Sequence, residues 1–187
     1  AIKTAQETAP NLGLGLHFVL SFGAPLSNPD NVPSLVTSEG KFVTTYSDLM
    51  TKMPSFSDND LERELRAQFE RFRELAGCLP DHLDSHHGST YQHPTAFKIM
   101  LSIAKEHNLP IRWFDGIDKR YDLDSESSNQ LHKIYAENAP VRSTDTIVNL
   151  IFDFESANAS ATRFSAISGC RFFLISFVMT TSINFDY

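Results

Sequence analysis

Residues 80–94 hold four of the seven histidines of the chain, so this short segment is rich in groups that bind metals and move protons. His82, Asp84 and His86 alternate at the spacing of one face of a β-strand, and we expect their side chains to converge. Converging imidazole and carboxylate groups suit a divalent cation. The alternative is a structural hydrogen-bond network, in which Asp84 accepts from an imidazole and fixes its tautomer. The same alternation predicts that His87 faces the opposite side.

His17 is a second candidate, because it is the one ionisable residue in the apolar segment 12–22. This segment predicts a buried strand. An isolated histidine on such a strand is more often a hydrogen-bonded core residue than a metal ligand. The residue alone leaves both interpretations open.

The elements that must position these residues follow one another as strand, long loop, helix, strand, helix, strand, helix and strand. This order predicts an α/β fold with parallel strands and outer helices. The carboxyl ends of parallel strands form active sites in such folds, so we expect His17 and the segment 82–93 to share one site. The predicted strands are 12–22, 82–84, 111–114 and 146–152, and the predicted helices are 58–76, 94–108 and 130–138.

The helix 58–76 has the strongest pattern. Ser57 or Asp58 can cap its start, and Gly77 can end it. Its buried stripe is predicted to be Leu61, Leu65, Phe69, Phe72 and Leu75. The preceding loop, 23–52, is broken by prolines and is expected to carry function, because long loops in α/β proteins commonly do. One further strand is expected in the tail, 155–187.

Composition limits the class of protein. The 187 residues suit a single domain, 1–187, and a formal charge of −7 with a pI near 5.4 argues against a nucleic-acid partner. Cys78 and Cys170 form no recognisable disulfide or zinc motif, which favours a reducing, cytoplasmic location. The longest apolar run, 172–179, is much shorter than the roughly 20 residues of a membrane span, so no membrane partner is expected.

Several motifs in order resemble one known family. They are Gly15-Leu16-His17, a proline-rich loop with Val32-Pro33-Ser34-Leu35 and Gly40-Lys41-Phe42, Glu64-Leu65-Arg66-Ala67-Gln68, His82-Leu83-Asp84-Ser85-His86-His87, and Leu109-Pro110-Ile111-Arg112. Together they resemble the YdjC-like carbohydrate deacetylases, which include the chitooligosaccharide deacetylases. The resemblance covers about residues 12–154.

The resemblance implies an irregular (β/α) barrel that holds one divalent metal ion, Mg or Zn, through an aspartate and two histidines. The matching histidines are His17 and His86, with Asp84 and His82 as the catalytic groups beside them. The implied reaction is hydrolysis of the N-acetyl group of an amino sugar, in which the metal polarises the amide and activates water.

Four further residues are candidates for substrate contacts, and each has an alternative role. His87 and His93 are as well suited to surface positions, Arg112 to an ordinary salt bridge, and Trp113 to the core.

The sequence also departs from the family pattern. The family's paired aspartates precede the Gly-Leu-His segment, whereas here Glu7 is the only acid before His17. Gly88, Ser89 and Thr90 replace a histidine-rich continuation, and a late His-Pro-Gly motif is absent. The start at Ala1 and the divergent tail, 155–187, suggest a fragment or an altered product. An incomplete barrel would expose strand edges, which favours a homo-oligomer.

These observations support two functions of different kinds. The first is a metal-dependent hydrolase that removes N-acetyl groups from amino sugars such as chitooligosaccharides. The second is a catalytically inactive remnant that acts as a carbohydrate- or metal-binding scaffold, because the aspartate pair is missing. A hydrolase of another amide or ester on the same barrel stays open, since a fold does not fix a substrate.

Overall fold

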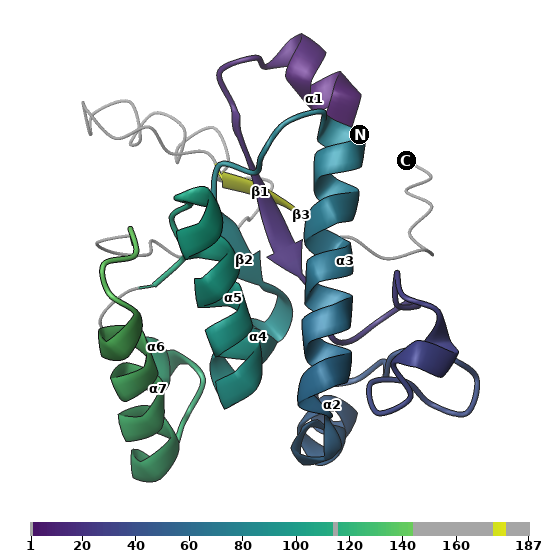
Figure 1. Cartoon of the computed structure of the whole chain (residues 1–187), viewed down its shortest axis with the longest axis vertical. Coiled ribbons are helices and arrows are strands. Elements are labelled where there is room, and N and C mark those ends of the chain that lie inside the picture. The colour runs from purple at the N-terminus through teal and green to yellow at the C-terminus, as the bar shows by residue number, and fades with distance from the viewer. Residues whose placement is uncertain (1, 114–115, 144–173, 179–187) are drawn as a thin grey trace, which may run out of the picture.

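The computed structural model describes residues 2–113, 116–143 and 174–178, and these residues form a mixed α/β structure (Figure 1). The described strands are β1 (Gly13–Phe18), β2 (Leu83–Ser85) and β3 (Leu174–Val178). They form a parallel sheet in the order β2-β1-β3. The register places His17 of β1 directly opposite Asp84 of β2.

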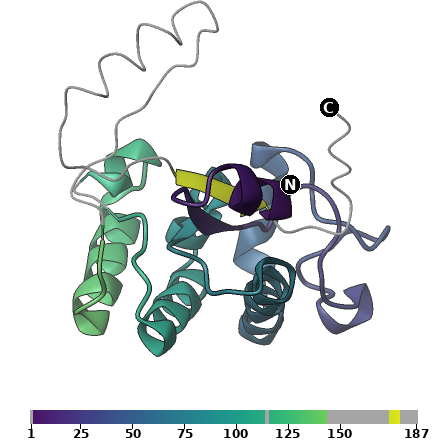
Figure 2. The ribbon, with the colours of Figure 1, turned by 90° about the horizontal axis from the view of Figure 1, so that it is seen from above.

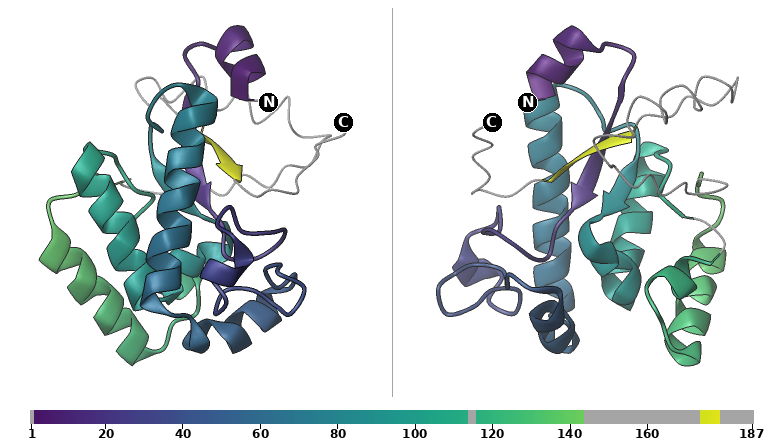
Figure 3. Two further views of the ribbon diagram at one scale, coloured as in Figure 1. Left: turned by 45° about the vertical axis from the view of Figure 1, so that its right-hand side comes forward. Right: turned by 180° about the vertical axis from the view of Figure 1, so that it is seen from behind.

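The three long helices are α3 (Asp58–Ala76), α5 (Pro94–His107) and α7 (Ser125–Asn138). They lie side by side in one layer, with the strands along one side of it (Figure 2). From behind, the strands lie in front of these helices (Figure 3, right). The described helices are α1 (Ile2–Thr8), α2 (Tyr46–Lys52), α3 (Asp58–Ala76), α4 (Ser89–Gln92), α5 (Pro94–His107), α6 (Ile117–Arg120) and α7 (Ser125–Asn138), with 3₁₀ turns at Pro29–Asn31, Met53–Ser55 and His86–Gly88. The predicted α/β class with parallel strands and outer helices is confirmed, although the described strands do not close into a barrel.

β1 has two chemically different faces because successive side chains alternate. Leu14, Leu16 and Phe18 are buried and belong to the main core. Gly13, Gly15 and His17 therefore share the opposite face of the strand. The helix-facing side holds the sheet in place, and the other side is left for the polar site.

The prediction for α3 is confirmed at both ends. The helix begins at Asp58 after Ser57, and Gly77 ends it in the left-handed conformation with φ of 70°. The apolar stripe is buried from Leu61 to Phe72. Leu75 is 41% exposed, so its assignment to the stripe was wrong, because the helix ends one residue later.

The next two helices differ in how well their starts were predicted. α5 begins at Pro94 and ends at His107, and the next residue, Asn108, takes a left-handed φ of 53°, as the sequence predicts. α7 begins at Ser125, well before residue 130, because Asp124 Oδ1 accepts a hydrogen bond from the backbone N–H of Ser127. The loop 23–52 is also more ordered than predicted, since α2 occupies its end.

Two predicted strands are shorter in the structure. β1 ends at Phe18 rather than residue 22, because the backbone N–H and C=O of Val19 both bond to the side chain of Gln68. The strand predicted at 111–114 is reduced to isolated bridges at Ile111, because the N–H of Trp113 turns back to bond to the carbonyl of Ile111. The strand predicted at 146–152 lies outside the described residues. β3 fulfils the expectation of one strand in the tail.

None of the described helices combines the length and the apolar character needed to cross a membrane.

Candidate functional site

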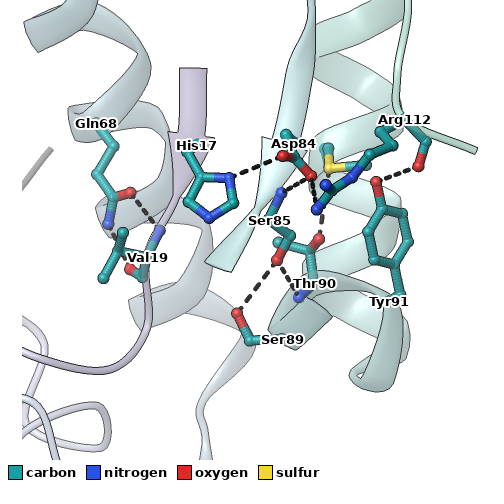
Figure 4. A network of polar contacts seen from close by, with 10 residues as sticks. His17, Val19, Gln68, Asp84, Ser85, Ser89, Thr90, Tyr91 and Arg112 are labelled. Atoms are coloured by element: carbon teal, nitrogen blue, oxygen red, sulfur yellow. Dashed lines mark hydrogen bonds and ion pairs between the residues drawn. The ribbon is translucent and has the colours of Figure 1, made fainter. Parts of the chain in front are cut away.

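The pairing of β1 with β2 builds a buried ion network around Asp84 (Figure 4). His17 Nδ1 lies 2.9 Å from Asp84 Oδ2. The other carboxylate oxygen, Oδ1, lies 2.5 Å from Nη2 of Arg112 and accepts the backbone N–H of Ser85 at 2.6 Å. Asp84 is 3% exposed, so a buried carboxylate is balanced by partners from three segments of the chain.

These partners fix the protonation of Asp84 and the tautomer of His17. Burial would raise the pKa of Asp84, but the hydrogen bond from His17 and the charge of Arg112 hold that pKa below its ordinary value. An ionised carboxylate can only accept hydrogen bonds, so Nδ1 of His17 carries the proton. The lone pair of a neutral His17 ring is then on Nε2, to which no described residue hydrogen-bonds. A carboxylate that orients an imidazole in this way is typical of metal-binding histidines.

His86 and His87 follow β2 on a tight turn. The ring of His86 lies 5.4 Å from that of His17, at an interplanar angle of 78°. His87 takes a positive φ of 53°, and its ring lies only 4.0 Å from that of His86. The prediction that His87 faces the opposite side was wrong, because β2 ends at Ser85 and strand alternation no longer applies. We call His17, Asp84, His86, His87 and Arg112 the histidine cluster.

The turn is held by the small polar residues on either side of it. The backbone N–H of Thr90 bonds to Ser85 Oγ at 3.0 Å, and Ser85 Oγ lies 3.3 Å from Ser89 Oγ. All three side chains are buried. The small polar residues therefore fix the position of the two histidines.

The environment keeps His86 neutral at pH 7. Burial, followed by the neighbouring His87, lowers the pKa of His86 to about 4. Burial also lowers the pKa of His87. A neutral imidazole has a lone pair to offer to a cation or a proton.

Two aromatic residues that sequence reasoning missed lie over these histidines. The ring of Phe22 is 5.8 Å from both the His86 and the His87 rings, and that of Tyr46 is 5.8 Å from His87. Phe22 is 42% exposed and has a φ of 66°, which is strained for an aromatic residue. The only sequence signal for the conformation of Phe22 is the Phe-Gly pair at 22–23. A positive φ at a residue other than glycine depends on contacts with residues far away in the chain, so local patterns do not predict it.

His82 lies on the same strand face as Asp84 but is buried below it. Its side chain packs so closely on Gly15 that a Cβ atom there would lie 1.9 Å from His82 Nε2. Burial lowers the pKa of His82 to about 4. His82 is 6% exposed, so it is part of the packing around the site and is not accessible to a ligand.

Arg112 and Trp113 follow Ile111 in the chain, but their side chains have different surroundings. Arg112 engages Asp84, and the hydroxyl of Tyr91 donates to the carbonyl of Arg112 at 2.5 Å. This geometry matches the salt-bridge alternative for Arg112. The ring of Trp113 is 5% exposed and is stacked between Phe97, at 5.5 Å, and Tyr135, at 4.1 Å. This burial favours the core alternative over a sugar contact.

His93 lies apart from the histidine cluster, at the start of α5. Its Nδ1 lies 3.4 Å from the backbone N–H of Ala96, so it caps the helix. Its ring packs against Phe56 with centroids 6.1 Å apart.

A second buried polar network anchors the loop that precedes α3. We call Asp60, Glu64 and Gln68 the loop clamp. Glu64 accepts the backbone N–H groups of Leu26 and Ser27 at 3.0 and 2.9 Å. Asp60 Oδ2 accepts from both the backbone N–H and the hydroxyl of Ser34, and Gln68 holds Val19. The Glu64-x-x-x-Gln68 motif thus has a structural role, because it fixes the chain where it leaves β1.

The described residues supply no complete metal shell. Within 2–113, 116–143 and 174–178, no three His, Cys, Asp or Glu side chains are grouped so as to hold a metal ion. Glu7 lies on α1, at the amino end of β1 and so away from the histidine cluster at the carboxyl end. Of these residues, His17 and His86 could serve as two ligands, and a third would have to come from outside the described residues.

Comparison with solved structures supports the fold. A putative cellobiose-phosphate cleavage protein from Enterococcus faecalis V583 matches with a TM-score of 0.64 and 24% sequence identity. The match covers 95% of this chain and 66% of that protein.

Sequence comparisons identify the family. The chain is 36% identical to a carbohydrate deacetylase from Brevibacillus brevis, over 82% of this chain and 60% of the relative. It is 40% identical to a chitooligosaccharide deacetylase from Proteus mirabilis, over 55% of this chain and 38% of that relative. The chain thus spans about 60% or less of the length of these relatives. The family model described as YdjC-like protein matches residues 1–174. The chain therefore belongs to the YdjC-like protein family.

Proposed function

We propose that the chain provides the histidine part of a divalent-metal deacetylase site for N-acetylated amino sugars. The observation that carries this proposal is the pairing of His17 and His86. Asp84 holds the proton of His17 on Nδ1, and the ring of neutral His86 lies 5.4 Å away. The named activities of the relatives, carbohydrate and chitooligosaccharide deacetylases, support the choice of substrate.

The donor set fits a divalent cation in part. A cation bound by His17 Nε2 and His86 would polarise the acetamido carbonyl and lower the pKa of water. Imidazole ligands favour Zn, whereas a site completed by a carboxylate and waters favours Mg. The parallel strands with outer helices are consistent with a segment of a (β/α) barrel.

The residues of the chain have separate tasks in this proposal. Asp84 keeps the proton on Nδ1 of His17, and Arg112 keeps Asp84 ionised. His82 packs against Gly15, two residues before His17 on β1. His87 has the most exposed imidazole of the histidine cluster, and burial lowers its pKa, so as a neutral base it would take the proton of the attacking water and then give that proton to the departing amine.

The second candidate function is an inactive scaffold that binds carbohydrate or metal. The observation that favours it is the lack of a third ligand among the described residues. The first candidate predicts turnover of an N-acetylated sugar, whereas the second predicts binding of carbohydrate or metal without turnover.

Metal content and acetate release distinguish them. The parent chain should bind about one divalent ion per molecule and release acetate from N,N′-diacetylchitobiose. The His17→Ala and His86→Ala variants should lose both properties while keeping the parent circular dichroism spectrum. His132→Ala is the matched control, because His132 is exposed on α7 and outside the histidine cluster. Bound metal without acetate release would support the scaffold. A folded parent chain without metal would reject the metal site.

A further inference from the structure

The backbone of His87 has a conformation that histidine rarely adopts. His87 has a φ of 53° and a ψ of 14°, and Gly88 after it has a φ of 65°. Two successive left-handed residues turn the chain sharply after β2, and the rings of His86 and His87 lie 4.0 Å apart. The left-handed region is unfavourable for a residue with a Cβ atom. Contacts with other parts of the chain must therefore stabilise it at His87.

One such contact comes from Gln92, five residues further along the chain. Gln92 Nε2 donates a hydrogen bond to the backbone carbonyl of His87 at 2.9 Å, and Gln92 Oε1 accepts one from the hydroxyl of Tyr46 at 2.7 Å. A backbone carbonyl can only accept, so the NH₂ group of the amide must face His87, which leaves the amide oxygen for Tyr46. The two bonds together fix the orientation of the Gln92 side chain.

Tyr46 contacts His87 directly as well as through Gln92. The two rings lie 5.8 Å apart, at an interplanar angle of 85°. Tyr46 is the first residue of α2, and Thr45 caps this helix, because its Oγ1 accepts the backbone N–H of Asp48 at 3.1 Å. The cap fixes the end of α2 that carries Tyr46. The long segment that leaves β1 therefore returns to the histidine cluster at a defined point.

Burial in the core does not explain the arrangement of these two side chains. Tyr46 is 43% exposed, and Gln92 is half-buried. An exposed ring and a polar amide remove little apolar surface from water, so they contribute little to the hydrophobic stabilisation of the fold. Their hydrogen bonds lead instead to each other and to His87. The position of His87 is the better explanation for this arrangement.

Packing on the next residue is the alternative explanation for the turn. A Cβ atom at Gly88 would lie 2.2 Å from Cζ of Tyr121, so the ring of Tyr121 lies directly against this glycine. This contact explains why residue 88 has no side chain. It does not explain the hydrogen bond to the carbonyl of His87, which Gln92 supplies.

We propose that Gln92 is a positioning residue that, together with Tyr46, holds the imidazole of His87 at the histidine cluster. Gln92 acts through the backbone of His87 and does not touch the substrate. The use of His87 in proton transfer rests on the proposed function, whereas the position of its ring does not. Proton transfer depends strongly on the distance between the groups. A loosened His87 should therefore lower kcat while KM stays nearly constant.

NMR spectroscopy of the metal-free chain tests the geometry without any activity. The parent chain should show a nuclear Overhauser effect between the ring protons of Tyr46 and His87. Gln92→Met keeps a side chain of similar length that cannot donate a hydrogen bond, and it should lose this signal. An unchanged signal in this variant would overturn the proposal in favour of the packing of Tyr121 on Gly88.

Gln6→Met is the matched control for the loss of a glutamine amide. Gln6 lies on α1, and its Nε2 donates to the backbone carbonyl of Ala76 at the same 2.9 Å as Gln92 Nε2 to its own carbonyl partner. This variant should keep both the ring signal and the kinetic constants of the parent chain. Urea unfolding of both glutamine variants shows whether each remains folded under the conditions of the NMR and kinetic measurements.

Acetate release from N,N′-diacetylchitobiose gives the second test. Gln92→Met should lower kcat by about tenfold or more, with KM changed by less than about twofold. Tyr46→Phe keeps the ring but loses the hydroxyl, so it should lower kcat only about threefold. In the Gln92→Met background, Tyr46→Phe should cause no further loss, because the hydroxyl acts through Gln92.

The two tests separate failure of this proposal from failure of the proposed function. Loss of the ring signal with an unchanged kcat, or additive losses in the double variant, would overturn the positioning role of Gln92. A parent chain that releases no acetate would reject the deacetylase. The ring signal would then still decide whether Gln92 holds His87 at the histidine cluster.

Discussion

The loop clamp and the histidine cluster are both buried polar networks beside β1, but they end differently. In the loop clamp, Glu64 and Gln68 end on backbone groups of Val19, Leu26 and Ser27. In the histidine cluster, the network starts at Arg112, passes through Asp84 and ends on His17, whose Nε2 is bonded to no described residue. The first network is closed, whereas the second leaves one coordinating atom available.

Under the proposed function, this difference separates polar groups that hold the fold from polar groups that do chemistry. Burial alone does not distinguish them, because Glu64 and Asp84 are 0% and 3% exposed. Glu64 accepts hydrogen bonds from two backbone amides and from the side chain of Gln68, so its partners stabilise the loop. A carboxylate that holds one nitrogen of an imidazole also sets the tautomer at the other nitrogen. The final atom of each network is therefore the guide to its role.

The largest predicted effect concerns the support below the histidine cluster. Gly15→Ala should destabilise the fold by about 3 kcal/mol or more, because the new methyl group would meet the buried ring of His82 at 1.9 Å. Gly13→Ala is the matched control on the same face of β1. Its Cβ would lie 3.7 Å from Asp81, which is an ordinary contact. Urea unfolding of both variants checks this, and equal midpoints would show that His82 can move aside.

The local parts of this arrangement could be predicted from the sequence, whereas the contact at Gly15 could not. Local patterns were sufficient for α3 and α5, because their apolar periodicity and caps lie within each helix. The alternation of His82 and Asp84 correctly placed both on the face of β2 that meets His17. The fine fit between His82 and Gly15 joins residues far apart in the chain, so no local pattern reveals it.

The turn at 86–88 and the loop before α3 were unpredictable for a related reason. The positive φ of His87 is set by contacts with Gln92, Phe22 and Tyr46, which come from different elements. Glu64 reaches loop residues 37 and 38 positions away. Interactions across such separations depend on the assembled fold, and strand alternation misplaced His87 because it assumes that the strand continues.

The second prediction breaks the loop clamp. Gln68→Ala should destabilise the fold by about 2 kcal/mol, because the buried N–H and C=O groups of Val19 lose their partners. Arg63→Ala, at an exposed position of the same helix, should change stability by less than about 0.5 kcal/mol. Urea unfolding measures both. Metal affinity below the transition should match the parent chain, and a large loss of affinity would mean that the two networks are coupled.

The third prediction breaks the histidine cluster with little effect on the loop clamp. Asp84→Asn should weaken metal binding by about 10- to 100-fold, because a neutral amide no longer fixes the His17 tautomer. Asp81→Asn is the control, since Asp81 accepts the backbone N–H of Leu14 and lies outside the histidine cluster. Nitrogen NMR shifts of the His17 ring report the tautomer without any metal. An unchanged Nδ1–H form in the Asp84 variant would show that Asp84 does not set it.

The smallest effect is expected at an exposed carboxylate that accepts three hydrogen bonds. Glu106 on α5 accepts two hydrogen bonds from Arg66 on α3 and one from Ser102. These bonds, the one from Arg66 first, lower the pKa of Glu106 from 4.5 to about 2. Its side chain is 43% exposed, so solvent screens the pair, and Glu106→Gln should cost less than about 1 kcal/mol at pH 7.

The sign of the pH dependence follows from the lowered pKa of Glu106. The folded state favours the ionised carboxylate, so its stabilisation is fully present above the unfolded value of 4.5 and declines as the pH falls toward about 2. The stability difference between the parent chain and Glu106→Gln should therefore shrink over this interval, and also in high salt at pH 7. Urea unfolding from pH 7 to pH 3 measures it. A difference above about 2 kcal/mol at pH 7 would mean that exposure does not weaken this pair. The number of hydrogen bonds, and not burial or the atom at which the network ends, would then determine the stabilisation by Glu64, Asp84 and Glu106.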